Sequence, residues 1–135
     1  MSDIRVTTQY VNEAAGGGTV SLPPMPNPFT EAGVPSARVV DVDFVPDALL
    51  AEDATDYMSV VARDLADSED LSTAITNSTG ALAAGTSASG LPMAAVAGRD
   101  VASGSSVFFK KTEGASGAIL KGTLVVTWQA NRHSL

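Results

Sequence analysis

The chain lacks cysteine and has a single histidine, His133, close to its C-terminal end. Disulfides and thiolate zinc sites are therefore excluded, and a histidine in a polar tail is poorly placed for a catalytic triad. No apolar run approaches the roughly 20 residues that a membrane-spanning helix needs. With 8 basic residues against 15 acidic ones, the net charge of −7 argues against nucleic acid or an anionic membrane as a partner.

Sequence motifs for catalysis are missing as well. Neither the G-x-x-x-x-G-K-[ST] phosphate loop nor the G-x-G-x-x-G dinucleotide motif occurs. Carboxylates are the only potentially functional side chains that cluster in the sequence, namely Asp41, Asp43, Asp47, Glu52, Asp53 and Asp56. Their spacing lacks the central glycine and the terminal glutamate of a calcium-binding loop. We therefore expect a protein that is not an enzyme and needs no cofactor or metal, in which these residues form a solvated face or meet a basic partner.

The sequence is rich in small aliphatic residues, with 12 glycines and 7 prolines among its 135 positions. This composition is typical of short strands joined by many turns. The N-terminal segment 4–10 alternates, and it places Ile4, Val6 and Tyr10 on one face. That period of two predicts a half-buried strand.

Proline dominates the segment that follows. Five of the seven prolines fall between residues 11 and 36, where they exclude a central strand or an interior helix. Met25 and Phe29 are isolated apolar side chains in this segment, and a purely solvated linker does not need them. We predict that residues 1–36 form an extended Pro/Gly-rich arm that packs on a neighbouring molecule or folds back on its own domain.

Residues 37–135 have a sequence pattern typical of a globular domain. Val40, Val42 and Phe44 alternate with aspartates, and segments 107–111 and 123–129 also read as strands. Short strands separated by turn signals predict an all-β fold, an antiparallel β-sandwich or a jelly-roll-like barrel.

One stretch has two readings. Leu50, Ala54, Tyr57, Val61 and Leu65 recur at spacings of three and four, which favours a helix after Pro46-Asp47. The same residues also fit an acidic loop followed by a strand over 57–64.

Two segments resemble a family of small tailed-phage virion proteins that decorate the head. The run D-F-V-P-D-A-L-L over 43–50, followed by D-A-T-D-Y over 53–57, is similar to that family's F-V-P-D-A-A-L-T-A-N-D-T-N-Y. The run 101–128 ends in G-T-L-V-V-T-W and resembles the family's ending in G-T-L-V-V-E-Y. Here Ser105 and Ser106 replace the usual Asp-Val, and Lys121 replaces a proline. The resemblance favours the strand over 57–64.

The resemblance implies a non-enzymatic structural protein on the outer surface of the head of a tailed phage or phage-like particle. Its partners would be the major capsid protein and further copies of itself, in a symmetric homo-oligomer such as a trimer or pentamer. The arm would supply the contact, with its strand adding to an exposed sheet edge. The predicted contact residues are Ile4, Val6, Tyr10, Met25 and Phe29.

Two other functions remain open at this point. The first is a base at capsid vertices that holds a head spike or fibre protein for attachment to a host surface, using an exposed loop such as 78–98. The second is a secreted carbohydrate-binding module. The absence of a signal-peptide pattern and the few aromatic residues count against this second alternative.

Overall fold

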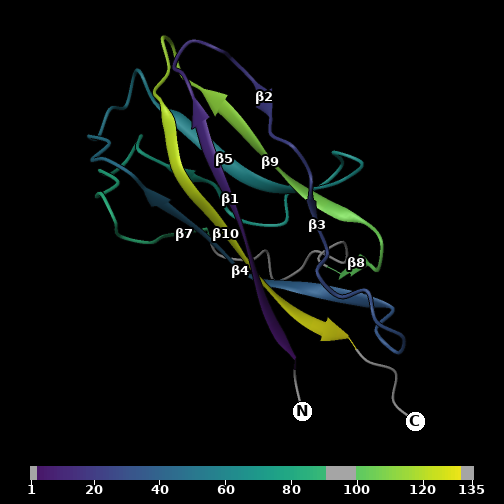
Figure 1. Ribbon diagram of the computed structural model, residues 1–135. Helices are drawn as coiled ribbons and strands as arrows, with labels where there is room; N and C mark the ends of the chain where they lie inside the picture. Colours follow the sequence, from purple (N-terminus) through teal and green to yellow (C-terminus); the bar gives the residue numbers. More distant parts are fainter. Residues whose placement is uncertain (1–2, 91–99, 132–135) are drawn as a thin grey trace.

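The computed structural model describes residues 3–90 and 100–131, and within these ranges the chain forms strands and no helix. The strands build two antiparallel sheets with the hydrophobic core between them (Figure 1). The predicted all-β class is confirmed, and the two sheets are consistent with a sandwich. In the described ranges, no helix is long and apolar enough to cross a membrane.

Each sheet has five strands in the described part of the chain. Sheet A consists, in spatial order, of β1 (Ile4–Glu13), β10 (Leu120–Asn131), β4 (Ser36–Pro46) and β7 (Ala88–Gly90), with β8 (Asp100–Ala102) also paired to β4. Sheet B consists of β2 (Val20–Ser21), β9 (Ser106–Glu113), β5 (Met58–Asp64) and β6 (Ile75–Thr76), with β3 (Met25–Pro26) also paired to β9. Sheet A therefore holds the three longest strands.

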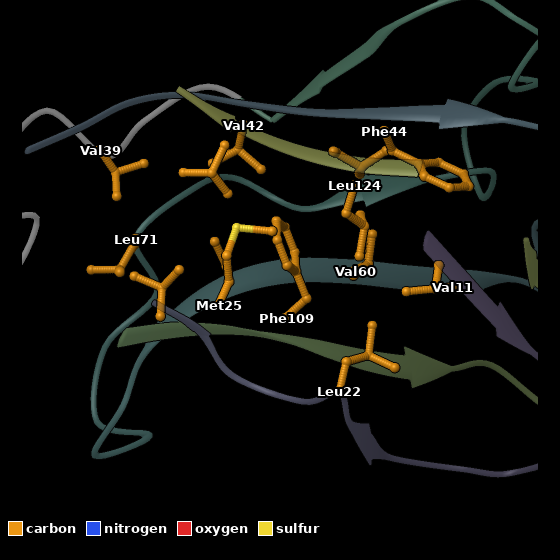
Figure 2. Packing of buried hydrophobic residues seen from close by; sticks show 14 of the residues in the cluster. Val11, Leu22, Met25, Val39, Val42, Phe44, Val60, Leu71, Phe109 and Leu124 are labelled. Carbon is orange, nitrogen blue, oxygen red and sulfur yellow. The ribbon is translucent and has the colours of Figure 1, made fainter. Parts of the chain in front are cut away.

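Side chains that alternate along the strands fill the space between the sheets (Figure 2). In β10, Leu124, Val126 and Trp128 are fully buried, whereas Val125 and Thr127 between them are half-buried. Burying one such apolar side chain stabilises the fold by about 1.5–3 kcal/mol relative to exposure. Because a slip of one residue would expose the whole set, this pattern fixes the register of the strand.

A β-bulge interrupts the alternation of β4. Val40 has no partner on β10, because the residues on either side of it pair with the adjacent Thr127 and Trp128. Val39 before the bulge and Val42 after it are both fully buried, so the inward phase moves by one residue. Simple alternation over 40–44 grouped Val40 with the core residues, and the bulge leaves it half-buried instead.

The stretch with two readings is a loop followed by strand β5. Met58, Val60 and Ala62 are buried with a period of two, and β5 pairs along its whole length with β9. The predicted strand is confirmed, and the helical spacing of Leu50 and Tyr57 has no counterpart in the structure.

Residues 3–35 do not form an arm that is separate from the sandwich. β1 pairs with β10 over ten residues, and β2 and β3 pair with β9 in the opposite sheet. The apolar side chains of the connecting segment are buried in the core, namely Leu22, Met25, Phe29 and Val34. Figure 2 shows Leu22 and Met25 in the same layer as Val60, Phe109 and Leu124. The predicted boundary between arm and domain, after residue 36, therefore falls at the start of β4, and residues on both sides of it belong to the same two sheets.

Hydrogen bonds hold this segment in place despite its prolines. The buried Asn27 donates through Nδ2 to the carbonyl of Val101 at 2.9 Å, and its Oδ1 accepts the N–H of Phe29 at 2.9 Å. Ser103 Oγ donates to the Phe29 carbonyl at 3.1 Å. Side chains thus form hydrogen bonds with backbone groups that, in a regular strand, would pair with a neighbouring strand.

Candidate interaction surface

Strand β1 turns its apolar face to solvent. Ile4, Val6 and Tyr10 are 53%, 58% and 59% exposed, although they are the residues whose alternation predicts burial. We call these three side chains the apolar stripe. Single exposed apolar side chains are ordinary, but a row of three on one strand marks a candidate contact surface.

The polar face of β1 points inward because the proline segment lies beneath it. The indole N–H of Trp128 donates to Thr7 Oγ1 at 2.8 Å, and the Thr7 hydroxyl donates to Met25 Sδ at 2.8 Å. Gln9 Nε2 donates to the carbonyl of Pro23 at 3.0 Å. Gln9 thus supplies a donor to a carbonyl of a segment that has few backbone donors of its own, since proline has no N–H, and Thr7 donates to the thioether of the same segment.

Arg5 completes this inward arrangement. Its guanidinium lies over the ring of Phe29, with 4.3 Å between Cζ and the ring centroid. It forms a two-pronged pair with Glu31 at 2.6 and 3.0 Å, and Nη1 also donates to the Pro28 carbonyl at 2.9 Å. The hydrogen bonds that Arg5 donates hold the pKa of the Glu31 carboxyl below its ordinary value. Arg5 and Glu31 thereby tie β1 to the proline segment.

Met25 and Phe29 are core residues. They are 5% and 0% exposed, so the chain's own side chains already cover the surfaces that a partner would need. This corrects their predicted role as contacts. Of the five predicted contact residues, only the apolar stripe lies on the surface.

Two further exposed apolar residues lie at the Tyr10 end of β1. Tyr10 Oη donates to Asp47 Oδ2 at 2.6 Å, and this hydrogen bond raises the pKa of Tyr10. Two residues after Asp47, Leu49 is 65% exposed, and Ile119 is 43% exposed across a small apolar hollow. The sequence carries no signal for this hollow, because its lining comes from two segments far apart in the chain, 44–50 and 119–121.

The acidic residues between 41 and 56 do not form one cluster. Asp41 and Asp43 are neighbours on the outward face of β4, and Ser89 Oγ donates to Asp41 Oδ1 at 3.3 Å. Burial first, and then the hydrogen bond with Asp41 and its charge, raise the pKa of Asp43. Asp53 instead accepts backbone N–H groups of its own turn, which lower its pKa, and Asp56 accepts the N–H of Ser116. Within residues 3–90 and 100–131, no three His, Cys, Asp or Glu side chains are grouped to hold a metal.

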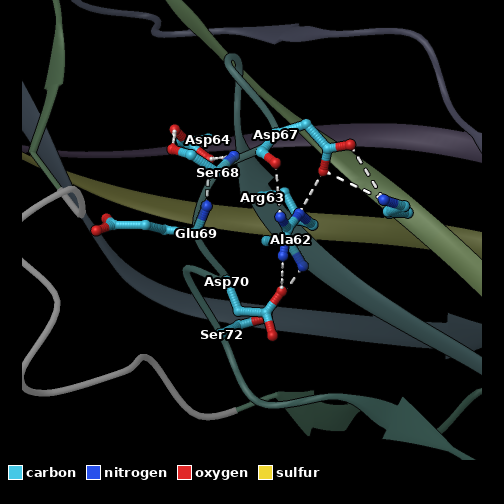
Figure 3. Close-up of polar contacts among 9 residues, drawn as sticks. Ala62, Arg63, Asp64, Asp67, Ser68, Glu69, Asp70 and Ser72 are labelled. Atoms are coloured by element: carbon cyan, nitrogen blue, oxygen red, sulfur yellow. Dashed lines mark hydrogen bonds and ion pairs between the residues drawn. The ribbon is translucent and has the colours of Figure 1, made fainter.

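A second charged region orders the turn after β5 (Figure 3). Arg63 pairs with Asp67 and Asp70, and Lys110 Nζ lies 3.0 Å from Asp67 Oδ2. Asp64 accepts the N–H groups of Ser68 and Glu69, both at 2.8 Å. Because most of these groups are partly exposed, the network orders the turn more than it stabilises the fold.

A buried ion pair lies at the end of β9 and contacts the loop after β1. Lys111 is fully buried, and its Nζ donates to the carbonyl of Ala14 at 3.0 Å and lies 3.7 Å from Glu113 Oε1. Burial would raise the pKa of Glu113, but the N–H of Gly16 and the charge of Lys111 outweigh it and hold this pKa below 4.5. Through the Ala14 carbonyl and the Gly16 N–H, the two side chains hold the loop after β1 against the end of β9. The alternation of β9, with Val107 and Phe109 inward, is the signal that places Lys111 inward as well.

No protein-family model matches the chain, and no curated protein matches it. The case for a function therefore rests on the surface just described and on the sequence motifs. Loop 78–98, expected to bind a second protein or glycan in the spike alternative, is described only to residue 90, and His133 lies outside the described residues.

Proposed function

We propose that this chain is a non-enzymatic structural virion protein that decorates the outer surface of the head of a tailed phage or phage-like particle, where it binds the major capsid protein. The observation that carries the proposal is the apolar stripe, Ile4, Val6 and Tyr10, on the outward face of a rigid sheet. A decoration protein needs such an adhesive surface on a stable, charged body. The two phage-like motifs, over 43–57 and 101–128, support the same assignment.

We also infer the jelly-roll-like form of the sandwich from the strand order. The chain passes from sheet A to sheet B after β1, β4 and β8, and it returns from B to A after β3, β6 and β9. Repeated crossing between two packed sheets is typical of the jelly roll, which is common in viral capsid and lectin domains. This order is compatible with a virion protein and does not by itself distinguish it from a sugar-binding one.

The aromatic side chains favour the virion protein over the carbohydrate-binding module. Trp128 is fully buried, and Tyr10 is the only exposed aromatic residue in the described part of the chain. A sugar-binding platform stacks ligand rings on exposed aromatic faces. The Tyr10 hydroxyl is also already bound to Asp47.

Co-sedimentation with capsids that lack this protein tests the proposal. The test variant replaces the stripe by Ile4→Thr, Val6→Thr and Tyr10→Thr, which keeps a residue type that suits strands. Losing about 1–2 kcal/mol of apolar contact per side chain weakens binding by roughly tenfold for each 1.4 kcal/mol. We expect the triple variant to stay in the supernatant at concentrations at which the natural protein pellets with capsids.

Leu65→Thr is the matched control, because Leu65 is 51% exposed but lies beyond β5 in the other sheet. We expect this control to pellet like the natural protein and both variants to melt near its temperature. Equal binding by the triple variant would show that the stripe is not the capsid contact. Failure of the natural protein to bind any capsid of its own particle would contradict the proposed function.

A further inference from the structure

The outer edge of β1 is a second feature of this strand, distinct from its apolar face. The carbonyl of Asp3 accepts the N–H of Ala130 at 3.0 Å, and β1 then pairs with β10 residue by residue as far as Glu13. In an antiparallel ladder, successive residues direct their backbone groups to opposite sides. The backbone N–H and C=O groups that point away from β10 therefore belong to Ile4, Val6, Thr8, Tyr10 and Asn12.

Among residues 3–90 and 100–131, none forms a strand that covers this edge, on the side of β1 opposite β10. The other edge strands have two or three residues each, and the β2–β3 edge also carries Pro23, Pro24 and Pro26. Long edge strands are normally protected by charges, prolines or bulges. The five residues that present free backbone groups on β1 include no charged residue and no proline.

We propose that a second copy of this chain covers the edge, through antiparallel pairing of β1 with the partner's β1 about a two-fold axis. This inference does not depend on attachment to a capsid. Three registers pair at least four of these five residues with their counterparts in the second copy, and they have Thr7, Thr8 or Gln9 on the axis. The charges of the strand distinguish among the three.

Charge complementarity favours the register with Gln9 on the axis. That register sets Arg5 opposite Glu13 of the second copy, and by symmetry it does so twice. With Thr8 on the axis, Asp3 would face Glu13, which is repulsive. With Thr7 on the axis, Arg5 would face an uncharged glutamine. In the described part of the chain, the contacts of Arg5 with Glu31 and Pro28 use Nη1 and Nη2, so Nε–H is left for a further acceptor.

The chosen register also joins the two apolar stripes. Val6 lies opposite Asn12 and Thr8 opposite Tyr10 of the second copy, which forms about eight backbone hydrogen bonds across the axis. Each Tyr10 ring then has Val6 of the other copy as its diagonal neighbour on the outward face, within reach of an aromatic side chain. The pair therefore presents one continuous apolar surface of double size.

Sedimentation equilibrium of the purified full chain tests this pairing. We expect a dimer, with a dissociation constant at least tenfold higher in Arg5→Glu and in Glu13→Arg, because each change sets like charges opposite each other. An equimolar mixture of the two variants is expected to recover the dimer, since glutamate then faces arginine at both positions. Such recovery is specific to this register.

Thr8→Pro gives an independent test in case Arg5→Glu fails to fold. It removes an N–H that the β1–β10 ladder does not use, and proline is tolerated at such an edge position. We expect a folded monomer, with Thr8→Ser as a dimeric control. A monomeric natural protein, a trimer or pentamer, or a dimer insensitive to all three changes would overturn the pairing. A dimer that ignores capsids contradicts only the proposed function, and a Thr8→Pro monomer that still binds capsids leaves that function standing.

Discussion

Phe29→Ala is expected to destabilise the whole domain, because the proline segment is part of its core. The ring is fully buried and lies 4.3 Å from the Arg5 guanidinium carbon. Truncating a buried phenylalanine costs about 3–5 kcal/mol, and losing the cation–π contact adds about 0.5–1 kcal/mol. A domain of this size has roughly 5–15 kcal/mol of stability in total. The substitution therefore removes a large part of it.

Urea unfolding measures this loss directly. The midpoint should fall with little change in slope, and the melting temperature should fall by about 10–30 °C at roughly 3–5 °C per kcal/mol. Leu65→Ala is the control, since Leu65 is half exposed and its truncation should change stability by about 0.5 kcal/mol or less. If Phe29→Ala unfolds at the same urea concentration as this control, the segment is not part of the core and the reasoning fails.

Three further substitutions probe backbone geometry and the buried ion pair. Gly122→Ala should lower the free energy of unfolding by about 2–4 kcal/mol in a urea titration. Gly122 has a φ of +153°, and a Cβ there would lie 2.2 Å from the Val45 carbonyl oxygen. An unchanged urea midpoint would contradict this prediction. Lys111→Met should cost about 3–5 kcal/mol because it leaves a buried carboxylate without its cation, and adding Glu113→Gln should recover part of the loss. If the double variant is no more stable than Lys111→Met, the two residues are not coupled. Glu113→Gln should lower the melting temperature at pH 7, but the difference should vanish in acid. The pKa of Glu113 is depressed in the fold, so its contribution is present above pH 4.5 and is lost as the pH falls through the folded value. A difference that stays constant from pH 7 to pH 3 would refute this.

Period-two alternation in the sequence predicts four of the five longest strands, β1, β4, β9 and β10. The last three bury one face against the opposite sheet. The stretch that contains β5 also has a helical spacing, and only the family resemblance favours the strand there. The bulge at Val40 is not visible in the sequence, since an aliphatic residue there fits either phase. Its effect becomes clear only from the pairing with β10.

The alternation of β1 predicts a strand but gives the wrong buried face. Arg5, Thr7 and Gln9 face inward because the proline segment, folded beneath them, offers carbonyls, a thioether and an aromatic ring as partners. That tertiary contact is not encoded in any local pattern. The same contact explains why Met25 and Phe29 are core residues, although prolines alone suggest a loose segment.

The protein composition of purified particles tests the central claim most directly. Particles from the source that carries the gene for this chain would be purified through a density gradient, and this chain would be quantified in them by mass spectrometry against the major capsid protein. We expect this chain to be found in the particle fraction at a fixed ratio to the capsid protein. We also expect that it can be released from the particles while the head stays closed. Its absence from purified particles, or its presence only in trace amounts that vary between preparations, would contradict the assignment as a head decoration protein.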